Sequence, residues 1–183
     1  MKLVEKTLSS EEIYQGDYLK YRKDTVLLPN GKEATRDIIE HPGAVAIVAV
    51  TSDNELILVE QYRKAVDMEL LEVPAGKLEK NEHPYDCAFR ELEEETGYKA
   101  KNMKYLCDYH MLPHFSDAKI YFYLADKLTK VEAHRDFDEF INVKLIPMEE
   151  AKERVYKGLF GDAKTAIALM HYFNMLKRGD EVE

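Results

Sequence analysis

The stretch "GKLEKNEHPYDCAFRELEEETGY", residues 76–98, places four glutamates within the five positions 91–95. Like charges at helical spacing repel each other by about a few tenths of a kcal/mol per pair. Such a cluster is therefore either a solvated helix face or a site for a cation. Charge spacing alone favours the solvated face, so the residues around the cluster have to decide between the two.

A helix is predicted over 84–96. Pro84 suits the first helical position, where the N–H that proline lacks would have no partner inside the helix. Gly97 is placed to end the helix in the left-handed conformation that glycine adopts without strain. The glutamate cluster therefore lies in the last two turns of one short helix.

This helix has one apolar face, which is centred on Leu92. Its other core residues are Tyr85, Ala88 and Phe89. At 100° per residue, Glu91 and Glu95 line one rim of the apolar stripe, and Glu94 lies beside them. Three carboxylates on one flank are costly alone but become favourable around Mg²⁺ or Mn²⁺, which prefer hard oxygen ligands.

The rest of the chain alternates apolar runs with turn signals, which favours a mixed sheet flanked by helices. An antiparallel hairpin is predicted first, with its turn at Pro29-Asn30-Gly31. Strands are then predicted over 44–50, 55–62, 104–110, 119–126 and 140–146, and helices over about 148–157 and 162–178. With 183 residues and 45% hydrophobic side chains, the chain can bury a real core as about one domain.

Composition limits the partners and the compartment. A net charge of −9 without a basic stripe argues against nucleic acid, and it means that an anionic substrate would need local cations. Cys87 and Cys107 are both predicted to be buried thiols in a reducing compartment. The N-terminus lacks the apolar core of a signal peptide, and the apolar run 43–50 is too short to span a bilayer, so we expect a cytoplasmic protein.

The spacing around the glutamates resembles the Nudix box at every fixed position. The matching residues are Gly76, Glu82, Arg90, Glu91, Leu92, Glu94, Glu95, Gly97 and the bulky Tyr98. Many fixed residues at fixed offsets make this a highly specific signal, unlike a lone glycine motif. The resemblance implies the Nudix fold, an α/β/α sandwich with a mixed sheet, over 43–183, and hydrolysis of a nucleoside diphosphate linked to another group.

The resemblance also implies roles for individual residues. Glu91 and Glu95 would be the principal metal ligands and Glu94 an auxiliary one, with the backbone carbonyl of Ala75 completing the site. Arg90, together with Glu82, would orient these ligands. Clustered divalent ions neutralise charge on both phosphates of a diphosphate and make water nucleophilic, so they would supply the positive charge that this protein lacks.

A proline fifteen residues after Tyr98, Pro113, is typical of the ADP-ribose pyrophosphatase branch of the family. The segments around 28–50, 58–80 and 161–169 are similar to bacterial members of that branch as well. In that branch the N-terminal hairpin, here 1–42, is exchanged between two subunits, so a homodimer is implied. Arg36 and Arg63 would then contact the substrate. Tyr18 is a candidate to stack on adenine, and a strand residue packing on its neighbour is the alternative.

Two positions depart from the pattern of the branch. Ala118 and Phe137 occupy places where the branch usually has glutamates, the second of which acts on the nucleophilic water. Glu139 is the closest surviving carboxylate and our candidate for the base, with Asp138 or Asp136 as substitutes.

The leading hypothesis from sequence is Mg²⁺-dependent hydrolysis of ADP-ribose to AMP and ribose 5-phosphate, with Mn²⁺ as a possible metal. Another nucleotide sugar or a dinucleotide is the alternative substrate. A module that binds ADP-ribose without cleaving it is the alternative of a different class. Retention of the glutamates at 91, 94 and 95 argues against such a sensor.

Overall fold

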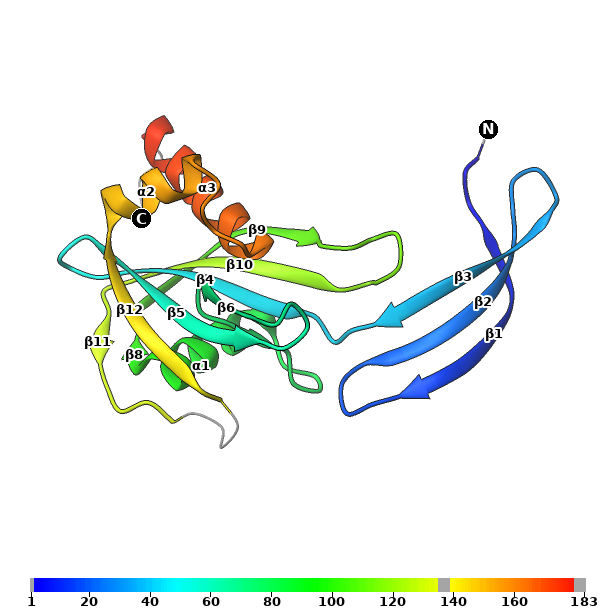
Figure 1. The fold of residues 1–183 in the computed structure, drawn as a ribbon, viewed down its shortest axis with the longest axis horizontal. Helices are drawn as coiled ribbons and strands as arrows, with labels where there is room; N and C mark the ends of the chain where they lie inside the picture. The colour runs from blue at the N-terminus through cyan, green and yellow to red at the C-terminus, as the bar shows by residue number, and fades with distance from the viewer. Residues whose placement is uncertain (1, 135–138, 180–183) are drawn as a thin grey trace. The chain divides into compact units, whose positions relative to one another are not determined.

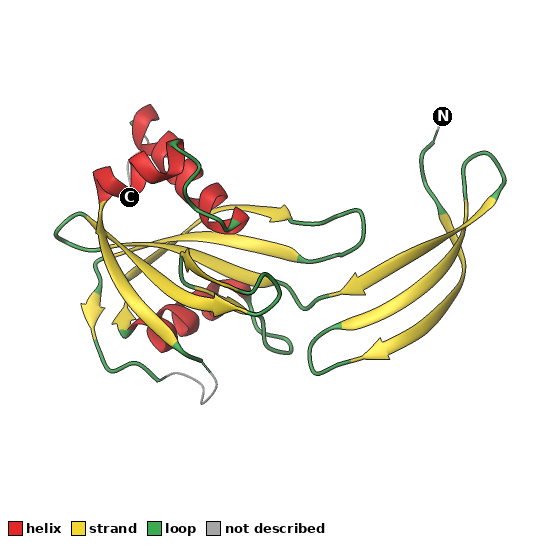
Figure 2. Cartoon of the chain, in the orientation of Figure 1, coloured by secondary structure: helices red, strands yellow, loops and turns green. Residues whose placement is uncertain are grey.

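A computed structural model describes residues 2–134 and 139–179 of the chain (Figure 1). Within these ranges the secondary structure comprises twelve strands and three helices (Figure 2). In order, they are β1 (Lys6–Gln15), β2 (Lys20–Leu27), β3 (Glu33–Glu40), β4 (Ala44–Val50), β5 (Glu55–Arg63), β6 (Met68–Glu72), β7 (Ala75–Lys77), α1 (Pro84–Thr96), β8 (Tyr98–Lys99), β9 (Asn102–His110), β10 (Lys119–Asp126), β11 (Thr129–Lys130), β12 (Ile141–Pro147), α2 (Met148–Tyr156) and α3 (Ala163–Arg178). The chain divides into two compact units, which are described separately.

The first unit comprises the segment up to Gly43 and the loop Tyr109–Lys119. Its sheet has the antiparallel order β1-β2-β3. The predicted hairpin is present as β2 and β3, but β1 adds a third strand that the sequence pattern did not indicate. Every residue of β1 is exposed, so this strand lacks the alternation of buried and exposed residues that marks a half-buried strand.

The second unit, Ala44–Asp108 and the chain from Ile120 on, contains the larger sheet. Its strand order is β12-β5-β4-β10-β9, with β6 paired to β5 and β7 paired to β4. The pair of β4 and β10 is parallel, whereas β4 and β5 are antiparallel. The predicted mixed sheet is therefore confirmed. Its central strand β4 is an almost continuous apolar run, as expected of a strand buried on both faces.

Helices cover both faces of this sheet (Figure 1). On one face, α1 inserts Leu92 and Ala88 against Ile47 and Ile57. On the other face, α3 packs against β4 and buries Leu169. The α/β/α sandwich that the sequence predicts is thus confirmed, and α1 lies on one face of a sheet whose strands fix its position.

The helix bounds agree closely with the sequence prediction. Helix α1 begins at Pro84, and Gly97 ends it with a left-handed φ of 71°.

Two predictions about burial are wrong. Tyr85 was placed on the core face but is 41% exposed, where it packs edge to face on Phe89. Cys107 is only half buried, whereas Cys87 is buried as predicted. None of the helices in the described ranges combines the length and the apolar character needed to cross a bilayer.

Candidate active site

The site is built where β7 leads into α1. Strand β7 is only three residues long, and it pairs with β4 through Ala75 and Ala46 and through Gly76 and Val45. The short strand holds the loop backbone flat against the sheet directly beside the last turns of α1. This arrangement brings the first and the last parts of the 76–98 stretch together.

Gly76 lies directly against the carboxylate of Glu91. A Cβ atom at position 76 would be 1.8 Å from Glu91 Cδ and 2.0 Å from Oε1, so a side chain there would force the carboxylate of Glu91 to move. Glycine at position 76 therefore leaves open a cradle, in which the carboxylate of Glu91 lies.

Glu91 and Glu95 are buried, with only 7% and 3% of their surface exposed. This corrects the prediction that they line the rim of the apolar face. Strand β7 covers their side of α1, so the buried face of the helix includes both side chains. The backbone N–H of Ala75 donates to Glu95 Oε2 at 2.9 Å. Burial raises the pKa of Glu91 to about 7 and that of Glu95 to about 8, and repulsion from neighbouring carboxylates, Glu94 and Glu139 for Glu91 and Glu91 and Glu139 for Glu95, is a smaller cause.

Arg90 is the main cation beside these carboxylates. Its guanidinium binds Glu82 in a bidentate manner, with Nε–Oε1 and Nη2–Oε2 both at 2.8 Å. Its Nη1 donates to Glu91 at 2.8 Å and to Glu94 at 2.9 Å. The hydrogen bonds from Arg90 lower the pKa of Glu82 to about 2. Arg90 and Glu82 therefore clamp the loop after β7 to α1.

The side chains fit a divalent cation by donor type, because Glu91, Glu94 and Glu95 offer carboxylate oxygens. Buried carboxylate oxygens with raised pKa values are stabilised when a cation replaces their protons. Within the described ranges, no three His, Cys, Asp or Glu side chains are grouped so that they could hold a metal ion. The reason lies in the contacts of Arg90, which holds Glu91 and Glu94, while Glu95 turns to Ala75. The ligand set from sequence therefore stays a prediction.

Arg63, at the end of β5, belongs to a second charged network. Its guanidinium binds Glu72 with Nε–Oε1 at 2.7 Å and Nη2–Oε2 at 2.6 Å. Glu72 is 1% exposed, and Lys164 of α3 donates to the same carboxylate. Arg63 contributes to the electrostatic environment of Glu95, so it lies toward the carboxylates of α1.

The N-terminus of α3 anchors the loop that leads to β7. Asp162 caps the helix by accepting from the N–H of Thr165 at 3.0 Å and from its hydroxyl at 2.6 Å. The Thr165 hydroxyl oxygen accepts in turn from the N–H of Val73 at 2.9 Å. Sequence reasoning missed Glu72, Lys164 and this cap. A single acidic residue in the otherwise apolar segment 70–73 was the available signal.

The other substrate residues predicted from sequence belong to the first unit. Arg36 forms an ion pair with Glu5, with Nη2–Oε1 at 2.6 Å. Tyr18 is 50% exposed and lies edge to face with His41, with ring centroids 6.0 Å apart. Pro113 is exposed in the loop between β9 and β10. Their roles stay predictions.

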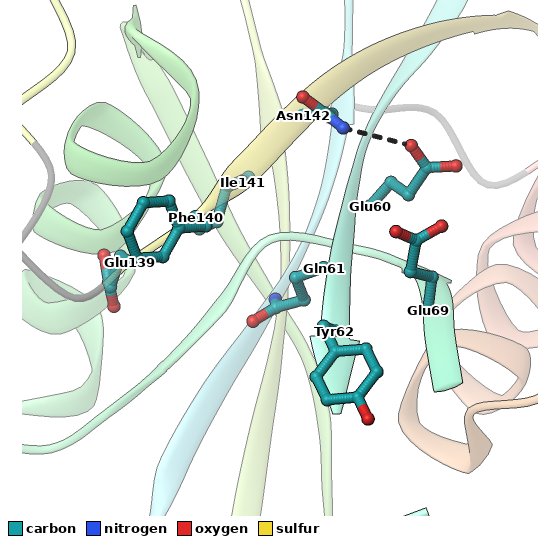
Figure 3. Close-up of a pocket in the computed structure, with 8 residues that line it drawn as sticks. All are labelled: Glu60, Gln61, Tyr62, Glu69, Glu139, Phe140, Ile141 and Asn142. Carbon is teal, nitrogen blue, oxygen red and sulfur yellow. Dashed lines mark hydrogen bonds between the residues drawn. The ribbon is translucent and has the colours of Figure 1, made fainter. Parts of the chain in front are cut away.

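Glu139, the predicted base, lines a pocket of about 330 Å³ between β5, β6 and the start of β12 (Figure 3). The other lining residues are Glu60, Gln61, Tyr62, Glu69, Phe140, Ile141 and Asn142. The charge of Glu139 contributes to the raised pKa values of both Glu91 and Glu95, so it acts on both carboxylates. Asp136, Phe137 and Asp138 lie outside the described residues.

Together, the sandwich and the site define a hydrolase that carries its carboxylates on a helix beneath a mixed sheet. Residues 40–167 match the family described as the NUDIX domain. The chain therefore belongs to the Nudix family, and it is a Nudix hydrolase. Residues 5–39 match the family described as the nucleoside diphosphate sugar hydrolase N-terminal domain.

Several known proteins are similar along most of the chain. A methanol dehydrogenase activator of Bacillus methanolicus is 43% identical over 91% of each chain. An ADP-ribose pyrophosphatase of Bacillus subtilis is 43% identical over 92% of each chain. An ADP-ribose pyrophosphatase of Mycobacterium tuberculosis is 39% identical over 83% of this chain and 75% of the relative. A crystal structure of an ADP compounds hydrolase superposes with a TM-score of 0.85 at 23% identity over 97% of each chain, which supports the fold.

Proposed function

We propose that this protein hydrolyses the diphosphate bond of ADP-ribose to AMP and ribose 5-phosphate, with Mg²⁺ as the working metal and Mn²⁺ as a substitute. The observation that carries the proposal is the cradle at Gly76, which holds the buried carboxylate of Glu91 beside Arg90. Two relatives, similar over 92% and 83% of this chain, bear the name ADP-ribose pyrophosphatase, which supports this choice among diphosphate substrates.

Glu91 and Glu95 would hold the metal, with Glu94 and the Ala75 carbonyl as further ligands. A bound divalent ion neutralises phosphate charge and makes water nucleophilic. For this to occur, Glu91 and Glu95 have to lose the protons that burial favours. Arg90 would keep the ligand helix joined to the loop, and Arg63 would bind a phosphate or ribose oxygen beside Glu95.

We assign the general base to Glu139, because its carboxylate lines a pocket and its charge acts on both Glu91 and Glu95. Glu139→Gln keeps the size of the side chain and removes its basicity. A positioned general base contributes roughly 10²–10⁴-fold, so kcat should fall within that range while KM changes little. A kcat within threefold of the parent protein would exclude Glu139 from this role.

We also propose a homodimer in which residues 1–42 of one protomer complete the site of the other. The fully exposed β1 and the separate family match of residues 5–39 support this arrangement. Mixing tests it: Arg36→Ala and Glu95→Gln proteins, each inactive alone, would regain activity when they are unfolded and refolded together. No recovery from a verified mixed dimer would place both residues in the site of one protomer.

The free thiols of Cys87 and Cys107 support a cytoplasmic location.

The first experiment separates products by chromatography after incubation with Mg²⁺ and, in turn, ADP-ribose, ADP-glucose, GDP-mannose, NADH, FAD and diadenosine polyphosphates. We expect AMP and ribose 5-phosphate from ADP-ribose, and no turnover after chelation or in Glu95→Gln. Faster cleavage of another compound in the panel would identify that compound, and not ADP-ribose, as the substrate. Binding of ADP-ribose without any cleavage would instead indicate the sensing module that was the alternative from sequence.

A further inference from the structure

Gln61 has a buried amide that no hydrogen bond accounts for. Its Nε2 is inaccessible to solvent and has no hydrogen-bond partner in the part of the chain that the structure describes. Leaving a buried donor unpaired is costly, and a native fold seldom accepts this cost without a reason. The main-chain register explains the burial, because Gln61 lies opposite Ile141 of β12 on one side and Leu70 of β6 on the other.

The side chain of Gln61 is on the face of the sheet that α1 covers. Side chains alternate along a strand, and the pairing of β5 with its neighbours runs without a register shift through this region. Ile57, which packs in the same core cluster as Leu92 of α1, therefore shares a face with Gln61 and Arg63. In Figure 3, Gln61 points toward the side on which Glu139 lies, away from Glu60 and Glu69.

An anionic oxygen of a ligand is the kind of acceptor that suits this amide. Gln61 and Glu139 line the same pocket, and no hydrogen bond joins them. Arg63, two residues further on, is already paired with Glu72. A neutral N–H donor beside several carboxylates can bind an incoming anionic oxygen without adding charge, and such charge-assisted bonds are stronger than neutral ones. A diphosphate group presents oxygens of this kind.

We infer that Gln61 is a substrate-binding residue whose Nε2 donates to a non-bridging oxygen of the diphosphate. The inference rests on the proposed function, because it assumes that the diphosphate lies on the α1 face of β5. It extends the site beyond the residues of the Nudix box to a strand position that composition and motif do not mark.

The test compares Gln61→Met, which keeps the length of the side chain but has no donor, with the parent protein. We expect kcat/KM for ADP-ribose with Mg²⁺ to fall roughly 10–100-fold, the range for losing one hydrogen bond to a charged group. The melting temperature without ligand should be unchanged or higher, because the unpaired donor is gone. A purely structural role would lower both quantities together. Gln61→Glu should lose more activity, because its carboxylate repels the diphosphate.

Lys64→Ala is the control, since Lys64 directly follows β5, has a side chain that is 87% exposed and is not among the residues that line the pocket. It should keep the parent kcat/KM. The inference is overturned if Gln61→Met stays within twofold of the parent, or if its melting temperature falls along with its activity. It is also overturned if only the pH–rate profile moves, because Gln61 would then act through Glu139 and not on the substrate.

A separate readout distinguishes this inference from the proposed function. If the parent protein cleaves a different nucleoside diphosphate sugar, the same comparison is made with that compound, since the diphosphate is shared. If the parent protein cleaves nothing, the rise in melting temperature on adding ADP with Mg²⁺ replaces the rate. A smaller rise for Gln61→Met than for Lys64→Ala supports the contact, and equal rises refute it.

Discussion

The carboxylate of Glu91 lies where the side chain of residue 76 would be if that residue were not glycine. The cradle is so close that an added Cβ would be 1.8 Å from Glu91 Cδ. Since β7 holds position 76 against β4, the loop cannot move away without breaking its pairing with Val45. The side chain of Glu91 would have to move instead, which would displace a predicted metal ligand.

Gly76→Ala should therefore disable the site more than it damages the fold. We expect kcat to fall at least ~10²-fold, as when a reacting group is misplaced by about 1 Å, and the free energy of unfolding to fall by about 1–3 kcal/mol, the usual cost of overpacking. Urea denaturation and steady-state kinetics measure the two effects. In a Glu91→Ala background, the same substitution should cost little stability because the clashing carboxylate is absent. An undiminished cost there would show that the clash is with the backbone.

The stability of the metal-free protein should depend on pH through Glu91 and Glu95. Their pKa values in the fold are about 7 and about 8, both above the ordinary value of 4.5. At pH values between the ordinary pKa of 4.5 and the raised pKa values, the folded state binds more protons than the unfolded state. The free energy of unfolding therefore falls as pH rises through this range. Urea denaturation with a chelator should show highest stability near pH 5 and a decline up to pH 8.

Two changes should flatten this decline. Glu95→Gln removes one of the titrating groups, so its stability should exceed that of the parent protein at pH 8 and approach it at pH 5. Mg²⁺ should stabilise the parent protein far more at pH 8 than at pH 5, because protons and metal compete for the same oxygens. Equal stabilisation by Mg²⁺ at both pH values would place the metal away from Glu91 and Glu95.

Arg90 should contribute to stability through its geometry as well as its charge. Its planar fork binds Glu82 with two parallel hydrogen bonds, which lysine cannot reproduce. We expect Arg90→Lys to lower the free energy of unfolding by about 1–3 kcal/mol, because the loop after β7 loses its clamp and buried acceptors are left unpaired. Chemical denaturation at pH 7 measures this loss.

Lys99→Ala is the control for Arg90. Lys99 is exposed, and its Nζ lies 3.5 Å from Oε2 of Glu93, which is on the opposite flank of α1. Exposed pairs of this kind contribute about 0–1 kcal/mol, so the variant should be close to the parent protein. Similar losses for the two variants would mean that general charge balance, and not the clamp, stabilises α1.

Features that depend on neighbouring residues in the chain, such as the ends of a helix, were predicted correctly from the sequence. Pro84 and Gly97 set the ends of α1 through backbone conformation, and the prediction was correct to the residue. The rim position of Glu95 was wrong because a helical wheel does not include β7, which covers that flank. Strand β1 was missed because all its residues are exposed, so that main-chain pairing with β2 is the only feature that marks it. The second cation on Glu72, Lys164, comes from α3, 92 residues further along the chain, and no local pattern contains it.

Glu72 should be the least replaceable charge in the second network. It is buried at 1% exposure between the cations of Arg63 and Lys164. Glu72→Gln keeps its shape but leaves Arg63 without its anion, while Lys164 keeps Asp162, and removing one partner of a buried ion pair typically costs ~3–5 kcal/mol. Chemical denaturation should show this loss, and kcat/KM should fall in the fraction that remains folded, because Arg63 loses its orientation.

Lys164→Met separates stability from positioning in the same network. Methionine fills the space of the lysine stem, and the bidentate pair of Arg63 and Glu72 remains intact. We therefore expect a smaller loss of stability than for Glu72→Gln, and a kcat/KM within a few-fold of the parent protein. Lys64→Ala, which removes an exposed pair with Asp67, should change neither quantity. If Lys164→Met lost as much activity as Glu72→Gln, the role of orienting Arg63 would belong to α3 and its lysine, and Glu72 would serve only to connect them.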